Sequence, residues 1–382
     1  MNYKIAIIGL GYVGLPLSLQ FSKKYKVIGL DINSNRINQL KLFNDFTNEV
    51  DEDQLKKGLK RNLKLTSNYN DIIDCNIFII TVPTPITETK KPDLTYLISA
   101  SKSIGKILKK GNIVIYESTV YPGCTEEDCV PLLETYSKLK YNEDFFCGYS
   151  PERINPGDKV NSINTIVKVT SGSNNSTAKI VDRLYSSIID AGTHPVSSIK
   201  IAEASKAIEN AQRDLNISFV NELAIIFDKM DIDTTEVLNA AGTKWNFLNF
   251  KPGLVGGHCI GVDPYYLAFK SQSLGYNPEV ILSGRKVNDN MGNFVATRFI
   301  RLMKANSIKV LKSKVLLLGI TYKENCPDIR NSKIPSVSRL LEENGINVDV
   351  YDPHASNSEV FDIYGIKLIE NLSIYDGIIL AV

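Results

Sequence analysis

The sequence lacks most of the features that mark a membrane, secreted or metal-binding protein. None of its apolar runs approaches the roughly 20 residues needed to span a bilayer. Met1 leads directly into the apolar run at residues 4–8, without the basic segment, apolar segment and cleavage site of a secretion signal. The six cysteines lack paired zinc-type spacing, and the three histidines share no spacing with carboxylates. These absences predict a cytoplasmic protein with reduced thiols, no membrane partner and no metal site.

Charge and length narrow the class of protein further. The 44 lysines and arginines nearly balance the 42 aspartates and glutamates, so no global field attracts nucleic acid. No basic segment interleaved with aromatic residues supports nucleic-acid binding either. At 382 residues, the chain exceeds the usual length of one domain. We therefore predict a chain of several domains, in which local groups hold any anionic ligand.

Hydrophobic periodicity predicts the fold class. Over the first 150 residues, short β-branched runs alternate with longer amphipathic segments, a rhythm that indicates a parallel sheet covered on both faces. Two long helical patterns follow at 199–230 and 279–304, and a second α/β rhythm begins at 314. We predict an α/β protein with two Rossmann-like parallel-sheet domains joined by a long helical spine. Because the sequence stops on a predicted strand, we expect the last residues of the native domain to be missing here; a naturally short end is the alternative.

A glycine-rich turn stands where an apolar strand passes into a helix. Its sequence is Gly9-Leu10-Gly11-Tyr12-Val13-Gly14, and Asp31 ends the next predicted strand. In this dinucleotide-binding fingerprint the first glycine permits the tight turn, the second lets the backbone approach a pyrophosphate, and the third lets helix and strand pack closely. The helix N-terminus offers amide groups to the phosphates. Asp31 would bind the ribose diol and repel a 2′-phosphate, which favours NAD over NADP, and Arg36 is placed to cover the adenine or reach a phosphate.

A second glycine-rich segment carries a single cysteine. In Gly256-Gly257-His258-Cys259-Ile260-Gly261, the glycines let the backbone approach a ligand and leave the thiol accessible. A cysteine is more often a small packing residue, and this alternative stays open for Cys259. The glycines and the nearby Asp263 favour a nucleophile. Cys75 and Cys147 lie beside strand-like runs and are predicted to be packing residues.

Three polar residues recur at helical spacing on the first long helix. Lys206, Asn210 and Arg213 fall at i, i+4 and i+7 and are predicted to share one face. A solvated helix face without a function is an equally good explanation for three polar residues at this spacing. Four alanines in the same stretch favour the functional interpretation, because they let the helix pack closely against a neighbour. A buried lysine on this face would stabilise an oxyanion.

Polar loops follow several predicted strands of the first domain. In open α/β sheets, ligands bind at the carboxyl ends of the strands, so we expect Thr119 and Glu152 to face a crevice there. The alternative interpretation is that these loops are turns without a function. Lys323 and Arg330 follow the first strand of the C-terminal domain and are placed to hold phosphates or contact a cofactor. The loops of the first domain are Val82-Pro83-Thr84-Pro85, Glu117-Ser118-Thr119 and Ser150-Pro151-Glu152-Arg153-Ile154-Asn155.

These motifs occur together, and in this order, in a known family. The sequence resembles the UDP-glucose/GDP-mannose dehydrogenase family over essentially its whole length. It is most similar to the UDP-N-acetylhexosamine 6-dehydrogenases of capsule and O-antigen synthesis. The motifs that carry the resemblance are Gly9–Gly14 with Asp31, Thr84-Pro85, Glu117-Ser118-Thr119, Ser150-Pro151-Glu152-Arg153, Lys206 with Asn210, Gly256-Gly257-His258-Cys259 with Asp263, and Lys323 with Arg330.

The resemblance implies three parts and one overall reaction. The parts are an NAD-binding Rossmann domain at 1–197, a helical central domain at 198–304 that forms a homodimer, and a C-terminally truncated UDP-binding Rossmann-like domain at 305–382. The reaction oxidises the CH2OH of a UDP-sugar to a carboxylate in two steps, each using one NAD. A thiolate captures the intermediate aldehyde as a thiohemiacetal, which is oxidised to a thioester and then hydrolysed.

The resemblance also implies a role for individual residues. Cys259 is the nucleophile, Lys206 stabilises oxyanions, and Glu152 is the base for thioester hydrolysis. Asp263, Asn210 and Thr119 position the lysine and a water. The implied cofactor-binding residues are Gly9, Gly11, Tyr12, Val13, Gly14, Asp31, Arg36, Pro83, Thr84, Ser118, Thr119 and Arg330. The implied substrate-binding residues are Glu152, Arg153, Ile154, Asn155, Lys206, Asn210, Arg213, Gly256 and Lys323.

The identity of the sugar and two other classes of protein stay open. His258, the run 262–266 and Arg213 resemble the branch that acts on N-acetylated sugars, so UDP-GlcNAc or UDP-GalNAc is the expected substrate, with UDP-ManNAc and UDP-Glc as alternatives. One rival is a single-step 3-hydroxyacid-type dehydrogenase, which needs no cysteine loop. The other is a non-catalytic NAD-binding scaffold. The thioester route yields two NADH per sugar, the first rival one, and the second none.

Overall fold

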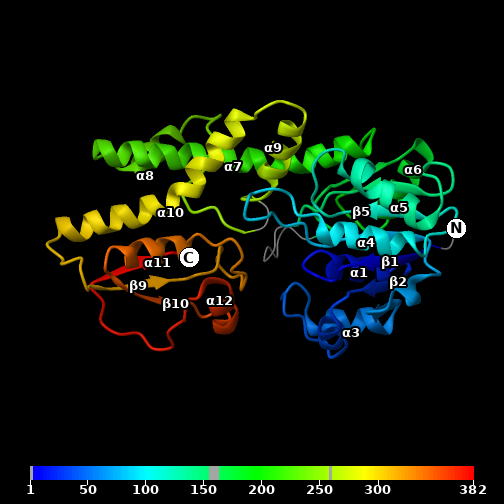
Figure 1. Cartoon of the computed structure of the whole chain (residues 1–382), viewed down its shortest axis with the longest axis horizontal. Helices are drawn as coiled ribbons and strands as arrows, with labels where there is room; N and C mark the ends of the chain where they lie inside the picture. Colours follow the sequence, from blue (N-terminus) through cyan, green and yellow to red (C-terminus); the bar gives the residue numbers. More distant parts are fainter. Residues whose placement is uncertain (1–2, 155–162, 258–259) are drawn as a thin grey trace. The chain divides into compact units, whose positions relative to one another are not determined.

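The computed structural model of the chain (Figure 1) describes residues 3–154, 163–257 and 260–382. The chain divides into two compact units. Unit 1 contains residues 1–208 and 265–270, and unit 2 contains residues 209–264 and 271–382. In the described part of the chain, no helix combines the length and the apolar character that a membrane span requires.

Unit 1 is built on one eight-stranded sheet. Its strands are β1 (Lys4–Ile8), β2 (Lys26–Leu30), β3 (Leu63–Thr66), β4 (Ile77–Ile80), β5 (Ile113–Tyr116), β6 (Phe146–Tyr149), β7 (Lys168–Gly172) and β8 (Thr193–Pro195). The order is β3-β2-β1-β4-β5-β6-β7-β8, and every neighbouring pair is parallel except β6 and β7. All residues of β4 and β5 are buried, as expected for β-branched runs in a parallel sheet covered on both faces. The predicted α/β class is confirmed.

The helices of unit 1 follow the strands in the βαβ pattern. They are α1 (Gly14–Ser22), α2 (Ser34–Lys41), α3 (Glu52–Lys60), the 3-10 turn η1 (Tyr69–Ile72), α4 (Thr95–Gly105), the π-helical turn η2 (Thr125–Cys129), α5 (Val130–Ser137) and α6 (Asn175–Ser186). One core cluster joins β1, β4 and β5 to α1 and α6, with Phe21 and Tyr185 among its largest side chains. The sheet order reverses direction at β1, so the loops that leave β1 and β4 diverge at a topological switch point.

Four helices, two of them long, are described in the middle of the chain. They are α7 (Ile199–Met230), α8 (Thr234–Ala241), α9 (Asp263–Ser273) and α10 (Glu279–Ala305). The predicted helices at 199–230 and 279–304 are confirmed, the second with one further residue. The boundary between the two units falls between Ile208 and Glu209, inside α7.

The end of the chain forms a second parallel sheet with the order β10-β9-β11. Its elements are β9 (Lys314–Leu318), α11 (Ile334–Glu343), β10 (Asn347–Tyr351), α12 (Asn357–Tyr364) and β11 (Gly377–Leu380). Beyond these strands, Val350 and Leu368 form one isolated parallel bridge. The Ile369 amide donates to the Val350 carbonyl at 2.9 Å, and the Leu368 amide donates to the side chain of Asn357 at 3.0 Å.

A buried ion-pair network joins α7 to α10 within unit 2. The Arg285 guanidinium contacts the carboxylates of Asp214 and Asp289 at 2.5 Å each, and its side chain is only 2% exposed. Asn288 donates to the Asp214 carboxylate at 2.7 Å. Asn221 bonds to Asn288 and to both backbone groups of Gly253. The network therefore fixes the start of the loop that leads to Gly256.

Replacing Arg285 by methionine is expected to lower the free energy of unfolding by about 3–5 kcal/mol at neutral pH, because Asp214 would remain charged and buried. Burial already raises the pKa of Asp214 above its ordinary value, against the opposing charge of Arg285. A raised pKa in the folded state means that the native protein binds more protons than the unfolded chain, so the stability of the variant falls as the pH rises above about 4. Urea unfolding at pH 5 and pH 8 measures both effects.

The double variant Arg285→Met/Asp214→Leu is the control. It removes both charges and should recover most of the lost stability, since an apolar replacement of a buried ion pair is often neutral. An Arg285→Met protein that is as stable as the wild type at pH 8 would contradict the prediction.

Candidate active site

The glycine-rich turn adopts the shape that its sequence predicts. Gly9 has φ +95°, in the left-handed region that favours glycine, and it leads into α1. A Cβ added to Gly14 would lie 1.8 Å from the Gly9 carbonyl oxygen, so helix and turn pack in direct contact. A Cβ on Gly11 would meet no atom within 4 Å. The second glycine thus faces open space, where the sequence predicts the pyrophosphate.

The neighbouring groups fit a dinucleotide. Val13, the residue before α1, has no side chain that can cap the helix. The first amides of α1 therefore do not bond to the Val13 side chain. The Asp31 carboxylate is half-exposed and accepts two backbone amides at 2.9 Å each, Leu10 on Oδ2 and Asn33 on Oδ1. The bond from Leu10 ties Asp31 to the turn, and the carboxylate keeps further lone pairs for the hydroxyls of a ribose.

Arg36 lies inside the fold. Its Nε donates to the Leu10 carbonyl at 2.9 Å, its Nη2 lies 2.7 Å from an oxygen of Asp45, and the residue is 3% exposed. The Arg36 guanidinium therefore stabilises the glycine-rich turn through its hydrogen bond to the Leu10 carbonyl. Contact between Arg36 and an adenine or a phosphate stays a prediction.

The loops after β4 and β5 are tied to each other. Ser118 Oγ donates to the Val82 carbonyl at 2.6 Å, and Thr84 Oγ1 donates to the Thr119 carbonyl at 2.7 Å. The Tyr266 hydroxyl donates to the Thr84 carbonyl at 2.9 Å. The structure thus brings together four predicted cofactor-binding residues, namely Pro83, Thr84, Ser118 and Thr119.

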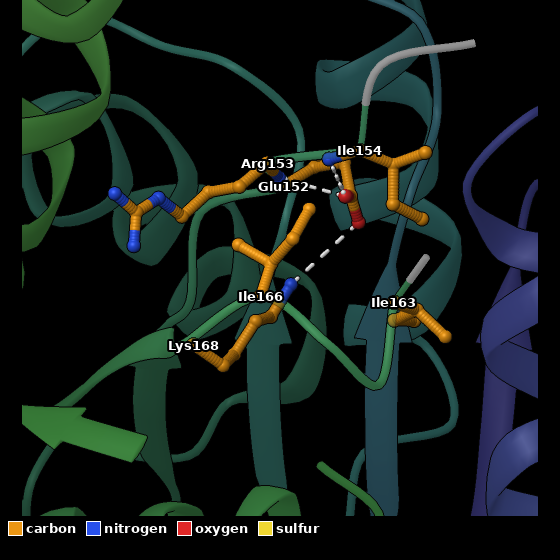
Figure 2. A pocket seen from close by; sticks show the side chains of 6 residues that line it. All are labelled: Glu152, Arg153, Ile154, Ile163, Ile166 and Lys168. Atoms are coloured by element: carbon orange, nitrogen blue, oxygen red, sulfur yellow. Dashed lines mark hydrogen bonds and ion pairs between the residues drawn. The ribbon is translucent and has the colours of Figure 1, made fainter. Parts of the chain in front are cut away.

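The loop after β6 presents Glu152 to a small pocket (Figure 2). Glu152 Oε1 accepts the backbone amides of Arg153 at 2.7 Å and Ile154 at 2.5 Å. Glu152 Oε2 faces Lys168 Nζ at 3.6 Å, and Lys168 also contacts Glu117. Sequence reasoning assigned no role to Lys168, although a lone lysine within the β-branched run at 166–169 signals a buried charge. Asn155, the next predicted residue of this loop, lies outside the described residues.

Helix α7 buries two of the three polar residues predicted on one face. Lys206 is 6% exposed and Asn210 is 9% exposed, whereas Arg213 is exposed. The Asn210 amide donates to the Asp263 carboxylate at 2.5 Å within unit 2. The buried face continues through Asp214 instead of Arg213, so a contact between Arg213 and substrate stays a prediction.

The second glycine-rich segment packs against the C-terminal part of unit 2. A Cβ on Gly257 would lie 2.7 Å from the Tyr322 ring, and one on Gly256 would lie 2.8 Å from Tyr322 Cβ. Asn331 donates to the Gly257 carbonyl at 3.1 Å. Among the described residues, these glycines therefore permit close approach to protein. His258 and Cys259 lie outside the described residues.

The other five cysteines are all buried and free, as predicted for Cys75 and Cys147. Burial raises the pKa of the Cys75 thiol to about 11 and that of the Cys147 thiol well above its ordinary value. Thiols in this state are protonated at neutral pH and are poor nucleophiles. In the loop between β9 and α11, Arg330 pairs with Asp328 at 2.8 Å and stays 41% exposed, and Lys323 is half-buried. In the part of the chain that the structure describes, no cluster of His, Cys, Asp or Glu is placed to hold a metal ion.

The fold and the glycine-rich turn define an α/β protein of the dinucleotide-binding class, and comparison with known proteins identifies its family. The chain belongs to the UDP-glucose/GDP-mannose dehydrogenase family. The NAD binding domain of that family matches residues 3–189, its central domain matches 200–290, and its UDP binding domain matches 316–382. The domain boundaries after residues 197 and 304 stay a prediction.

Individual relatives cover nearly the whole chain. UDP-N-acetyl-D-glucosamine 6-dehydrogenase of Pseudomonas aeruginosa is 60% identical, over 100% of this chain and 90% of its own length. The enzyme of the same name from Salmonella typhi is 56% identical, over 99% and 89%. Among solved structures, a UDP-D-ManNAc dehydrogenase from Pyrococcus horikoshii matches with a TM-score of 0.84 and 30% identity, over 92% of this chain and 84% of that one.

Proposed function

We propose that this protein oxidises the C6 hydroxymethyl group of UDP-N-acetyl-D-glucosamine to a carboxylate in two NAD-dependent steps, for the synthesis of a surface polysaccharide. The observation that carries the proposal is the 56–60% identity, over the whole chain, to two proteins named as UDP-N-acetyl-D-glucosamine 6-dehydrogenases. UDP-GalNAc, UDP-ManNAc and UDP-Glc are the alternative substrates. Family membership and the NAD binding domain support the cofactor.

NAD, when bound, accepts the hydride in each of the two oxidations. The turn at Gly9–Gly14 would hold its pyrophosphate, Asp31 would bind a ribose, and the tied loops that carry Pro83, Thr84, Ser118 and Thr119 would line its other end. The open space at Gly11 and the lack of a side-chain cap from Val13 support this placement. Arg330, in the loop between β9 and α11, is a further predicted contact.

The chain's own residues supply the remaining chemistry. The Cys259 thiolate attacks the aldehyde carbon to give a thiohemiacetal, whose second oxidation yields a thioester. Lys206 offers its ammonium to the developing oxyanions, while Asn210, Asp263 and Thr119 position the lysine and a water. Glu152 accepts a proton from the water that hydrolyses the thioester. The 2.5 Å bond between Asn210 and Asp263, and the burial of Lys206, support these roles.

Substrate contacts and assembly complete the proposal. The substrate would be held by Glu152, Arg153, Ile154, Asn155, Lys206, Asn210, Arg213, Gly256 and Lys323. We infer a cytoplasmic homodimer. Exposed apolar side chains on α7, among them Phe219 at 56% and Met230 at 58%, support an interface on the helical segment. Light scattering after size-exclusion chromatography tests the dimer.

The stoichiometry of NADH tests the reaction. With limiting UDP-N-acetyl-D-glucosamine and excess NAD, we expect two NADH per sugar, measured by absorbance at completion, together with a uronic acid identified by mass spectrometry. UDP-GalNAc, UDP-ManNAc and UDP-Glc assayed in parallel identify the sugar. One NADH per sugar would instead support a single-step dehydrogenase, and NAD binding without turnover would support a scaffold.

A further inference from the structure

Four ionisable side chains meet at one edge of the sheet of unit 1. Because β7 is antiparallel to β6, its first residue, Lys168, lies at the edge where β5 and β6 end. Lys168 Nζ lies 2.6 Å from Glu117 Oε2 and 3.6 Å from Glu152 Oε2. The Tyr185 hydroxyl of α6 donates to the other oxygen of Glu117. These groups come from β7, from the loops after β5 and β6, and from α6.

The cluster is buried, and this burial affects the pKa values of Glu117 and Lys168. The side chains of Glu117 and Lys168 are 0% and 4% exposed. Burial raises the pKa of Glu117 to about 7, although Lys168 opposes the shift. Burial lowers the pKa of Lys168, but the charges of Glu117 and Glu152 outweigh it and leave the net shift upward. Lys168 therefore stays a cation between the two acidic side chains.

The two oxygens of Glu152 differ in their surroundings. Oε1 is occupied by the amides of Arg153 and Ile154. Oε2 is buried, and among the described residues it has no hydrogen-bond partner, only the ion pair with Lys168. The pocket beside it, lined by Glu152, Arg153, Ile154, Ile163, Ile166 and Lys168, encloses about 10 Å³, close to the space that one water needs (Figure 2). Oε2 thus lies near a positive charge and has the geometry to accept a hydrogen bond from a water in this pocket.

We propose that Lys168, held by Glu117 and Tyr185, is a positioning residue that orients the Glu152 carboxylate with Oε2 turned toward the attacking water. The inference rests on the proposed function, in which Glu152 is the hydrolytic base. In that step, the water oxygen attacks the thioester carbonyl carbon, one water proton passes to Glu152 Oε2, the C–S bond breaks, and sulfur leaves as the Cys259 thiolate.

The double variant Glu117→Gln/Lys168→Met isolates this role. It removes the buried pair together, so that neither partner is left charged and alone, and Tyr185 keeps an acceptor. Both oxidations should still occur, but hydrolysis should slow. We expect a burst approaching two NADH per active site, then a steady-state kcat at least about tenfold below the wild type. KM for the UDP-sugar should fall together with kcat, because the covalent enzyme accumulates, and intact-mass spectrometry should detect the adduct on the protein.

Two further variants make the test specific. Lys168→Arg keeps the charge and should stay within about threefold of the wild-type kcat without a burst. Lys109→Met removes an exposed lysine that pairs with Asp74 at the opposite edge of the sheet and should change nothing. A slow double variant with neither burst nor adduct would overturn the role of Lys168, as would an arginine variant as slow as the double variant. A wild-type chain that makes fewer than two NADH per sugar rejects the proposed function, and the inference falls with it.

Discussion

Replacement of Cys259 by alanine is expected to reduce formation of the uronic acid at least about 10³-fold, because covalent capture of the aldehyde is lost. The first oxidation does not need the thiol, so a single turnover should give at most one NADH per active site. The second oxidation would require the free hydrate of the aldehyde. Quenched single-turnover reactions analysed by mass spectrometry measure aldehyde and acid separately.

A cysteine already shown to be buried serves as the matched control. Cys75 is 2% exposed, and burial raises the pKa of its thiol to about 11. The Cys75→Ala protein should lose some stability and keep two NADH per sugar. Equal loss of acid in both alanine variants, or full activity of Cys259→Ala, would remove Cys259 from the chemistry.

Alanine at Gly14 is the second change with a large expected effect. The added Cβ would lie 1.8 Å from the Gly9 carbonyl oxygen and 2.5 Å from Thr81 Oγ1. The closest atom belongs to the backbone, so the turn itself must move. Overpacking of this kind costs about 1–3 kcal/mol. We expect Tm to fall by several degrees and Kd for NAD to rise at least tenfold, as measured by scanning calorimetry and by titration calorimetry.

The Gly11→Ala variant separates the two effects. Because nothing lies within 4 Å of the added Cβ, Tm should stay close to that of the wild type. The methyl group would nevertheless occupy the space predicted for the pyrophosphate, so NAD binding should weaken. Unchanged NAD affinity in Gly11→Ala would place the cofactor elsewhere, and an unchanged Tm in Gly14→Ala would contradict the packing argument.

Features encoded by local periodicity were predictable from the sequence. The helices α7 and α10 carry apolar spacing over about 30 residues each, a signal long enough to fix their ends. The glycine-rich turn was predictable because each glycine answers a steric need, and the structure shows that need at Gly9 and Gly14.

Features that depend on long-range packing were not predictable from the sequence. The antiparallel β7 pairs with β6 through a register that no local pattern specifies, so Lys168 could not be placed beside Glu117 and Glu152. On α7, Lys206, Asn210 and Arg213 were predicted to share one face. The buried side turns toward Asp214, because Arg285 of α10 pairs with that carboxylate, and helical spacing alone does not reveal which neighbour a helix meets.

The path of the chain between the two units limits how this protein can be divided. The chain passes from one unit to the other at 208/209, 264/265 and 270/271, so a single cut in the gene yields no fragment that holds all of one unit and none of the other. A cut at the first crossing would sever α7 between Lys206 and Asn210, which lie one helical turn apart. Split-gene complementation should therefore fail at this position, and insertions should be tolerated best in exposed loops that lie within one unit.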